Sequence, residues 1–359
     1  MSKPKKVAIL YAGAKHWGGV ETYLEQLFVG VDPTKLDLTL VSIGEWELGE
    51  RLVASGFKTQ VIAGNWYNLT LVNKLAKYFK TDNYDLVTGQ GLVANFYGRL
   101  SAHKAQLPNL ITIHSDYKFD YQGFKAGLYH LTFKLFESYT AKYVVVSNFL
   151  KKEAMKLGVS DGKISVIYNG VKELSVEPKK RESTIIFGSL GRLHYKKGYQ
   201  LLIQAVTMIR ELDFEVHIWG EGDDRVQLEN QIQQNKLESK IYLEGFTKDI
   251  PSALSKIDIY IQPSLEEGFG ITVVEGMYAG KPVIVTPAGS LPELVTDGKT
   301  GLIANDVSPE SIATAMKALI ESPELCNKLA LAGHIEAKKR FGVDTWIAEI
   351  ERVYLETAR

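Results

Sequence analysis

Short apolar runs rich in β-branched residues alternate with helical patterns along this chain of 359 residues, and the alternation occurs twice. The first series of runs comprises Lys6–Tyr11, Leu38–Ile43, Leu86–Thr88, Leu110–Ile113 and Tyr143–Val146. The second series comprises Thr184–Leu190, Glu215–Trp219, Ile241–Glu244, Ile257–Ile261 and Pro282–Val285. Strands that alternate with helices in this way are typical of parallel α/β sheets. The sequence therefore predicts an α/β fold with two Rossmann-like domains.

The chain is also longer than one ordinary hydrophobic core accommodates, which favours two domains. Lys172–Ser183 contains Pro178 and no apolar periodicity, as expected of a linker. We predict an N-terminal domain over residues 1–172 and a C-terminal domain over residues 183–340. In the last segment, 341–359, apolar side chains recur at helical spacing over Val343–Thr357, so this helix should pack on a protein surface.

Composition excludes several classes of protein. No run approaches the roughly 20 apolar residues that cross a bilayer, and the first residues lack the apolar core of a signal peptide. Cys326 is the only cysteine, so an internal disulfide and a cysteine-based metal site are excluded. No Asp-x-Asp and no histidine cluster with metal-ligand spacing occurs. We expect a cytoplasmic protein that holds no metal and no cofactor.

The two halves of the chain differ in charge. Residues 1–172 hold 21 Lys and Arg against 14 Asp and Glu, whereas the remainder holds 21 against 28. A basic half favours an anionic partner such as a membrane surface or a phospholipid-linked molecule; scattered solvated lysines are the alternative. The aromatic and lysine-rich stretch Tyr117–Tyr143 is either such a surface or part of a core. Nucleic-acid binding is not expected, because a stacking-aromatic motif is missing.

The strongest site signal is QPSLEEGFGITVVEGMYAGKPVIV, residues 262–285. A predicted strand ends at Pro263, and a predicted helix begins near Ile271. Backbone N–H groups of Gly270, Ile271 and Thr272 would point from the start of this helix, where the helix dipole favours an anion.

Two glutamates belong to the same run. Glu275 lies one turn into the predicted helix and can accept both hydroxyls of a ribose, as acidic residues do in dinucleotide sites. Glu267 can accept hydroxyls of a second polyol beside the phosphates. Alternatively, both carboxylates only complement the helix dipole.

A basic loop, GRLHYKKG at 191–198, follows the first strand of the second series. Arg192 offers a planar fork for bidentate phosphate contact, and Lys197 offers a compact charge. Ligands of open α/β sheets bind outside the carboxyl ends of the strands, so we expect this loop to bind a diphosphate. A solvated surface loop is the alternative.

Two features of the first half complete the candidate site. The turn Gly13–Gly19 opens a predicted helix at Val20, and its glycines allow a ligand to approach the backbone, although a structural turn is an alternative. His114 follows the strand Leu110–Ile113 and should emerge at the carboxyl edge of the sheet; a packing role is its alternative.

Together these segments resemble the retaining glycosyltransferases of family 4. Glu267 to Glu275 matches the E-x7-E element of that family, and the following residues continue it. The resemblance covers nearly the whole chain and takes in further segments: Gly18-Gly19-Val20-Glu21, the His114 strand end, Val146-Ser147-Asn148, Asn169-Gly170-Val171, residues 191–198, Gly220-Glu221-Gly222 and Leu291-Pro292-Glu293. One departure is Ala288-Gly289-Ser290, where the family often has paired glycines, so a sugar contact there is in doubt.

The resemblance implies a GT-B fold, in which two parallel sheets face each other across a cleft and the C-terminal helix crosses back to the first domain. It implies that Glu275 holds the ribose, Glu267 the transferred sugar, and Arg192 with Lys197 the diphosphate. The amides of Gly270, Ile271 and Thr272 belong to the same donor site, and Thr247 lies in the loop that meets the base.

For the first domain the resemblance implies acceptor binding. Gly19 would approach the donor phosphates, Gly18 and His114 would bind the acceptor, and His114 would also contact the transferred sugar. His114, Arg192, Lys197 and Glu267 would thus act in catalysis.

The implied function is retaining, metal-independent transfer from a nucleoside diphosphate sugar, by family habit a UDP-sugar, to a hydroxyl acceptor. The acceptor would be a saccharide or a lipid-linked molecule in bacterial polysaccharide, lipopolysaccharide or glycolipid synthesis, with peripheral contact to the inner membrane face. Alternatives are a sugar-nucleotide epimerase or phosphorylase on the same scaffold, and a non-catalytic nucleotide-sugar-binding protein.

Overall fold

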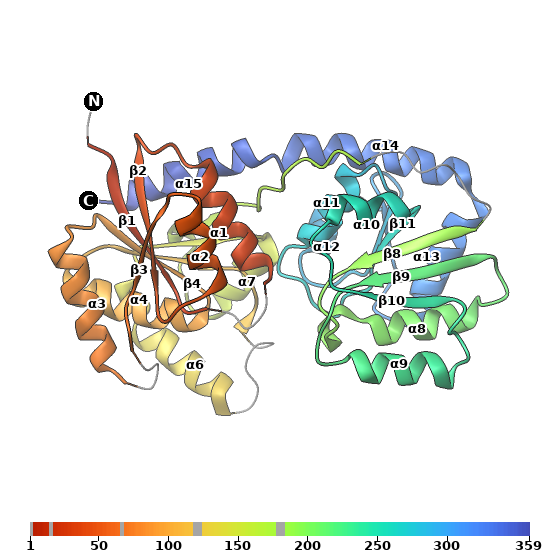
Figure 1. Ribbon diagram of the computed structural model, residues 1–359, viewed down its shortest axis with the longest axis horizontal. Coiled ribbons are helices and arrows are strands. Elements are labelled where there is room, and N and C mark those ends of the chain that lie inside the picture. The colour runs from red at the N-terminus through yellow and green to blue at the C-terminus, as the bar shows by residue number, and fades with distance from the viewer. Residues whose placement is uncertain (1–2, 14–16, 65–67, 118–123, 177–183) are drawn as a thin grey trace. The chain divides into compact units, whose positions relative to one another are not determined.

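The computed structural model describes residues 3–13, 17–64, 68–117, 124–176 and 184–359 (Figure 1). The chain divides into two compact units. Unit 1 comprises Met1–Gly170 together with Val343–Arg359, and unit 2 comprises Val171–Gly342. The predicted linker Lys172–Ser183 therefore begins within unit 2, and its residues 177–183 lie outside the described part of the chain.

Unit 1 is built on a parallel 7-stranded sheet with the order β3-β2-β1-β4-β5-β6-β7. Its strands are β1 (Lys5–Tyr11), β2 (Leu36–Ser42), β3 (Lys58–Val61), β4 (Leu86–Gln90), β5 (Asn109–Ile113), β6 (Lys142–Val145) and β7 (Ile164–Val166). Its α-helices are α1 (Gly19–Gly30), α2 (Glu47–Ala54), α3 (Thr70–Thr81), α4 (Leu92–Ala105), α6 (Phe124–Leu135), α7 (Asn148–Lys156) and α15 (Val343–Thr357), with short 3-10 turns at η1 (Glu137–Tyr139) and η2 (Asp161–Lys163).

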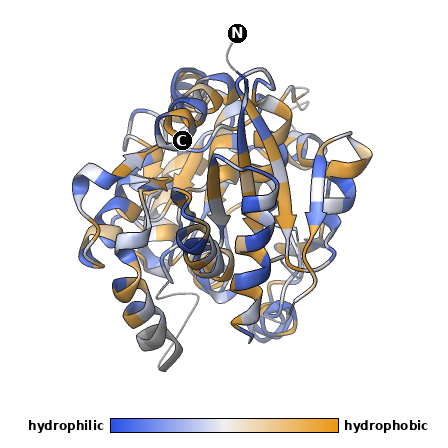
Figure 2. Cartoon of the chain, turned by 90° about the vertical axis from the view of Figure 1, so that its left-hand side faces the viewer, coloured by the Kyte–Doolittle hydropathy of each residue, from blue (hydrophilic) through white to orange (hydrophobic). Residues whose placement is uncertain are grey.

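Helices cover both faces of this sheet. Apolar residues of α1, α2 and α15 pack on one face of β1 and β2, and those of α3 and α4 pack on the other. A parallel sheet that is covered on both faces has strands that are apolar throughout, and Val7, Ala8, Ile9 and Leu10 are all fully buried. Figure 2 shows the central strands largely in the orange of hydrophobic residues.

The C-terminal helix α15 is an integral part of unit 1. Trp346, Ile350 and Tyr354 are buried in its core. A Cβ atom on Gly30 would lie 2.8 Å from the Ile347 side chain, so the last residue of α1 must be small. The buried Glu351 carboxylate accepts from the Lys35 ammonium at 2.7 Å, which fixes the helix in register.

Unit 2 is built on a parallel 6-stranded sheet with the order β10-β9-β8-β11-β12-β13. Its strands are β8 (Ile185–Leu190), β9 (Phe214–Trp219), β10 (Ile241–Gly245), β11 (Ile259–Gln262), β12 (Val283–Val285) and β13 (Leu302–Ile303). Its helices are the 3-10 turn η3 (Tyr195–Lys197), α8 (Tyr199–Met208), α9 (Arg225–Gln234), α10 (Ile250–Lys256), α11 (Ile271–Tyr278), α12 (Leu291–Leu294), α13 (Pro309–Glu321) and α14 (Pro323–Arg340).

The strand order of unit 2 reverses between β8 and β11. From β8 the chain adds β9 and β10 on one side, and then returns to add β11, β12 and β13 on the other. The chain therefore leaves the adjacent strands β8 and β11 at the carboxyl edge and continues towards opposite sides of the sheet. Such a switch point is where open α/β sheets bind ligands.

The predicted fold class, two Rossmann-like parallel α/β sheets, is confirmed. Every predicted strand is present, with ends that shift by at most two residues. The sequence pattern does not predict β3, β7 and β13, which are short strands at the sheet edges. No helix among the described residues is long and apolar enough to cross a membrane.

The aromatic stretch Tyr117–Tyr143 contributes to the core of unit 1. Tyr117, Phe133 and Tyr143 are buried, and the Phe133 ring lies 5.9 Å from that of Tyr143. Core packing therefore explains these three rings. Phe119 and Tyr121 lie outside the described residues.

Candidate donor site

Lys197 and Glu267 form an ion pair at the switch point of unit 2. Lys197 lies on η3 after β8, Glu267 lies in the loop after β11, and Nζ is 2.7 Å from Oε2. Their side chains are 25% and 14% exposed, so the pair is partly shielded and still accessible. The structure thus brings together two residues that lie 70 positions apart in the sequence.

The two loops touch because Gly198 allows it. Gly198 has φ +70°, and a Cβ atom there would lie 1.8 Å from the Pro263 carbonyl oxygen. Only glycine meets both conditions, since other residues disfavour the left-handed region and add a Cβ atom. The Lys196 carbonyl oxygen then accepts from the Leu265 N–H at 2.8 Å, which holds the loops together.

A chain of hydrogen bonds leads from the sheet to the Glu267 carboxylate. The buried Tyr260 hydroxyl donates to Gln262 Oε1 at 2.8 Å, and Gln262 Nε2 donates to Ser264 Oγ at 2.8 Å. Ser264 Oγ in turn donates to Glu267 Oε2 at 3.4 Å. Each donor in the chain is fixed by its predecessor, so the carboxylate is held by rigid strand residues rather than by the loop alone.

Ser290 clamps the backbone of the same loop. Its N–H donates to the Glu267 carbonyl oxygen at 3.0 Å, and its hydroxyl donates to the Phe269 carbonyl oxygen at 2.9 Å. Ser290 itself is fully buried. The departure from paired glycines at this position therefore supplies two hydrogen bonds to the loop that carries Glu267.

The helix α11 begins at Ile271, as predicted, with Gly270 in the left-handed region at φ +98°. No described residue accepts from the N–H groups of Gly270, Ile271 or Thr272. Unpaired amides at a helix start, together with the helix dipole, favour an anion.

Glu275 lies on α11 and is half-buried. Burial raises the pKa of its carboxyl to about 7. Among the described residues, none forms an ion pair or hydrogen bond with this carboxylate. The Glu275 carboxyl is therefore partly ionised near neutral pH. It makes no hydrogen bond with the described part of the chain and can accept from a ligand.

Arg192 and Thr247 complete the predicted donor residues in unit 2. Arg192 is exposed and makes no ion pair or hydrogen bond with any residue that the structure describes. Thr247 follows β10, and its hydroxyl accepts from the Asp249 N–H at 3.1 Å. Gly220, directly after β9, donates its N–H to the carbonyl oxygen of Gly245, the last residue of β10, at 2.8 Å.

In unit 1, His114 lies directly after β5, at the carboxyl edge of the sheet as predicted. Its Nε2 lies 2.7 Å from Gln90 Oε1, and its ring packs edge-on against Tyr23 at 4.7 Å. Burial lowers the pKa of His114 to about 4, so the ring is neutral at physiological pH.

Gly18 and Gly19 begin helix α1. The Gly18 N–H donates to Glu21 Oε2 at 2.8 Å, and the other Glu21 oxygen accepts from the Tyr11 hydroxyl at 2.5 Å. The buried Glu21 carboxylate therefore caps the helix and fixes the glycine turn. Residues 14–16 of the predicted turn lie outside the described part of the chain.

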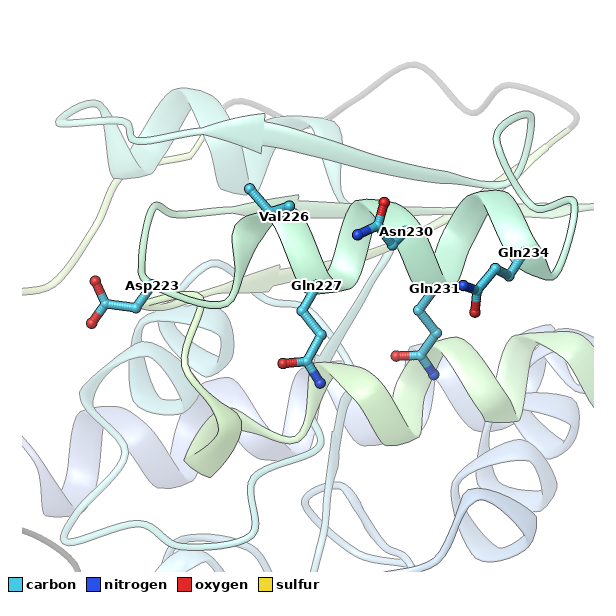
Figure 3. A pocket seen from close by; sticks show the side chains of 6 residues that line it. All are labelled: Asp223, Val226, Gln227, Asn230, Gln231 and Gln234. Atoms are coloured by element: carbon cyan, nitrogen blue, oxygen red, sulfur yellow. The ribbon is translucent and has the colours of Figure 1, made fainter.

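A separate hollow of about 610 Å³ lies along α9 (Figure 3). It is lined by Asp223, Val226, Gln227, Asn230, Gln231 and Gln234. None of the predicted site residues lines it. Among the residues that the structure describes, no group of three His, Cys, Asp or Glu side chains could hold a metal ion.

Comparison with known proteins gives the family. Residues 17–173 match the family model described as Glycosyltransferase Family 4, and residues 171–334 match the one described as Glycosyl transferases group 1. The chain is 32% identical to the uncharacterized glycosyltransferase MJ1178 of Methanocaldococcus jannaschii over 262 residues, 72% of this chain and 71% of that protein. The chain belongs to the family 4, or group 1, glycosyltransferases. This glycosyltransferase therefore carries its ion pair and its unpaired amides in the half that matches the group 1 model.

Two further comparisons refine the likeness. The glycosyltransferase is 24% identical to N,N'-diacetylbacillosaminyl-diphospho-undecaprenol alpha-1,3-N-acetylgalactosaminyltransferase of Campylobacter jejuni, over 71% of this chain and 73% of that enzyme. Its structure is similar to that of Anabaena HepE in complex with UDP and glucose, with a TM-score of 0.84 and 20% identity over 98% of this chain and 99% of HepE. The second likeness establishes the GT-B fold.

Proposed function

We propose that this glycosyltransferase moves a sugar from a UDP-sugar to a hydroxyl acceptor, with retention of configuration and without a metal ion. The observation that carries the proposal is the Lys197–Glu267 ion pair beside the unpaired amides that begin α11. One arrangement thus offers a cation and backbone donors for a diphosphate, and a carboxylate for sugar hydroxyls. HepE, which has the same fold, binds UDP and glucose.

The diphosphate and the transferred sugar each bind one residue of the ion pair. The diphosphate binds the Lys197 ammonium, the exposed Arg192 guanidinium and the amides of Gly270, Ile271 and Thr272. Glu267, released from Lys197, accepts hydroxyls of the transferred sugar. A preorganised cation of this kind stabilises the charge that develops on the leaving group, at about 3 kcal/mol for each donor.

The nucleoside binds further along the same edge of unit 2. The Glu275 carboxylate accepts the two ribose hydroxyls, and Thr247 lies in the loop that meets the base. In unit 1, Gly18 and His114 bind the acceptor.

In the reaction, the bond between the anomeric carbon and the leaving phosphate oxygen breaks and leaves an oxocarbenium-like sugar. The acceptor oxygen then bonds to the same face of that carbon. The acceptor proton passes to the departing phosphate oxygen, so no carboxylate base is needed.

We further propose a lipid-linked or saccharide acceptor. The name of the Campylobacter jejuni relative includes a diphospho-undecaprenol acceptor, and the basic composition of residues 1–172 suits contact with an anionic membrane surface. Synthesis of bacterial polysaccharide, lipopolysaccharide or glycolipid on the cytoplasmic side of the membrane would use such an acceptor.

The decisive experiment is a thermal-shift and hydrolysis screen with EDTA present. The donors are UDP-glucose, UDP-galactose, UDP-N-acetylglucosamine, UDP-glucuronate and GDP-mannose. We expect one UDP-sugar to stabilise the protein and to release UDP slowly, and the anomeric configuration of the product, measured by NMR, to match that of the donor.

Other outcomes favour the competing functions. Binding of a donor without turnover, with every acceptor tested, indicates a nucleotide-sugar-binding protein. Conversion of the donor to its epimer without release of UDP indicates an epimerase, and phosphate-dependent cleavage of a glycan indicates a phosphorylase. Activity that EDTA abolishes and a divalent metal restores contradicts metal independence.

A further inference from the structure

The contact between His114 and Gln90 links the ends of two neighbouring strands in unit 1. Gln90 ends β4 and is 2% exposed, and it pairs in register with Thr112 of β5, two residues before His114. The 2.7 Å distance from His114 Nε2 to Gln90 Oε1 is that of a strong hydrogen bond. A buried amide at the end of a strand has little freedom to move, so it fixes the ring it contacts.

In the structure the NH2 group of Gln90 faces away from His114. Gln90 Nε2 lies 3.2 Å from Thr112 Oγ1 and 3.5 Å from Thr88 Oγ1, so the NH2 group is directed to two hydroxyl oxygens. The carbonyl oxygen is thereby directed to the imidazole. Because an amide oxygen can only accept, the hydrogen of this contact belongs to His114 Nε2.

The ring carries a single proton near neutral pH, because burial lowers the pKa of His114 to about 4. With that proton on Nε2, Nδ1 carries a lone pair. No described residue donates a hydrogen bond to Nδ1. The ring plane is also fixed, since the Tyr23 ring packs edge-on at 4.7 Å and itself packs edge-on against Trp346 of α15 at 4.9 Å.

We propose that Gln90 is a positioning residue that holds His114 as the neutral Nε2–H tautomer, so that Nδ1 is presented as a hydrogen-bond acceptor to a sugar hydroxyl. The identity of the ligand rests on the proposed function, whereas the tautomer rests on unit 1 alone. A neutral acceptor selects a hydroxyl, which can donate, over a carboxylate, which cannot.

The tautomer can be measured directly. Long-range 15N–1H NMR correlations on the uniformly labelled full-length chain distinguish a protonated ring nitrogen from an unprotonated one, and His114→Gln identifies the signal among the seven histidines. We expect a protonated Nε2 and an unprotonated Nδ1 that persist from pH 6 to pH 8. A protonated Nδ1, or a ring that titrates within this range, overturns the proposal.

Two substitutions test the positioning role. In Gln90→Glu the carboxylate still accepts from Nε2–H but favours the imidazolium, so the acid limb of the rate profile should move to higher pH. In Gln90→Leu the hydrogen bond is lost, and kcat should fall about 10- to 100-fold, the range known for the loss of the hydrogen-bond partner that orients a metal-ligating histidine, with a smaller change in KM. An unshifted profile for Gln90→Glu, in a variant with an unchanged thermal midpoint, contradicts the proposal.

Failure of this proposal and failure of the proposed function are distinguishable. The NMR assignment needs no donor and no turnover, so it can support the tautomer even if no UDP-sugar is used. Conversely, a UDP-sugar can be turned over by a chain whose His114 carries its proton on Nδ1.

Discussion

Lys197 Nζ and Glu267 Oε2 lie 2.7 Å apart where the loops after β8 and β11 meet. In the structure the two charges neutralise each other. We expect a phosphate that binds Lys197 to draw the ammonium away from Glu267, so that the released carboxylate becomes available to another polar group. This exchange makes the two residues separable by mutation, although they touch.

Lys197→Ala should lower turnover about 100-fold or more, because it removes a preorganised cation from the leaving group. It should also weaken UDP binding. Glu267→Gln should lower turnover but leave UDP affinity unchanged or higher, because the carboxylate that competes for Lys197 is gone. Initial rates and calorimetric titration with UDP provide the two measurements. Lys317→Ala, which removes a 54% exposed surface lysine, is the matched control; equal loss of UDP affinity in Lys197→Ala and Glu267→Gln would contradict the exchange.

Glu275 should make stability depend on pH. Its pKa is raised from 4.5 to about 7 in the fold, so between these values the unfolded chain releases a proton that the folded chain retains. Stability from this group is thus present at low pH and is lost as pH rises towards 7, by about 3 kcal/mol. Glu275→Gln should become more stable than the wild type between pH 5 and pH 8 in thermal melts, whereas Glu238→Gln in an exposed turn should show no such trend.

The same group should couple UDP binding to pH. An ionised carboxylate accepts both ribose hydroxyls, so UDP affinity should rise as pH increases through about 7. Titrations of the wild type and of Glu275→Gln at several pH values would show it. A wild-type UDP affinity that does not change with pH, or a rise in affinity that persists in Glu275→Gln, would contradict a contact between Glu275 and the ribose.

Gly198 and Gly280 form a matched pair of glycines with positive φ. At Gly198, φ +70°, a Cβ atom meets the Pro263 carbonyl oxygen at 1.8 Å, whereas at Gly280, φ +65°, it meets nothing within 4 Å. Gly280→Ala should cost only the left-handed backbone penalty, about 1 kcal/mol. Gly198→Ala should cost more and should also abolish donor-dependent activity, because it separates the two loops. Equal destabilisation of the two variants in chemical denaturation would show that the contact between the loops adjusts to a Cβ atom at little cost.

Ile350 and Leu355 test the role of α15 in unit 1. Ile350 is fully buried and Leu355 is 38% exposed on the same helix. Ile350→Ala should destabilise unit 1 by about 2–5 kcal/mol, the range for a buried Ile or Leu truncated to Ala. Leu355→Ala should change stability by about 0.5 kcal/mol or less. Urea unfolding followed by hydrogen exchange would locate the effect, and equal shifts in both variants would contradict the packing of α15.

Much of the fold was predictable because its signals are local. A parallel sheet buried on both faces requires continuous apolar runs, and each such run corresponds to a strand. The strands β3 and β7 were missed because Lys58–Val61 is largely exposed and Ile164–Val166 has only three residues. Short edge strands are specified by their neighbours more than by their own composition.

The residues of the candidate site could be predicted from the sequence, but the contacts between them could not. The sequence indicates that Lys197 and Glu267 both follow strands, yet their ion pair depends on a strand order that places β11 beside β8. Gln90 gave no signal, because a glutamine at the end of an apolar run looks like the start of a loop. The sequence marked Ser290 only as a departure from paired glycines, whereas in the structure its hydrogen bonds hold the loop that carries Glu267.

Unit 1 is assembled from both sides of unit 2 in the sequence, and this has a consequence for synthesis on the ribosome. Residues 171–342 are continuous and have their own core, so they can fold as soon as they emerge. The earlier part of unit 1 must wait for α15, with the surface that receives Trp346 and Ile350 uncovered. At typical translation rates the wait is on the order of 10–30 s, long enough for a nascent chain with an exposed apolar surface to recruit a chaperone or to aggregate.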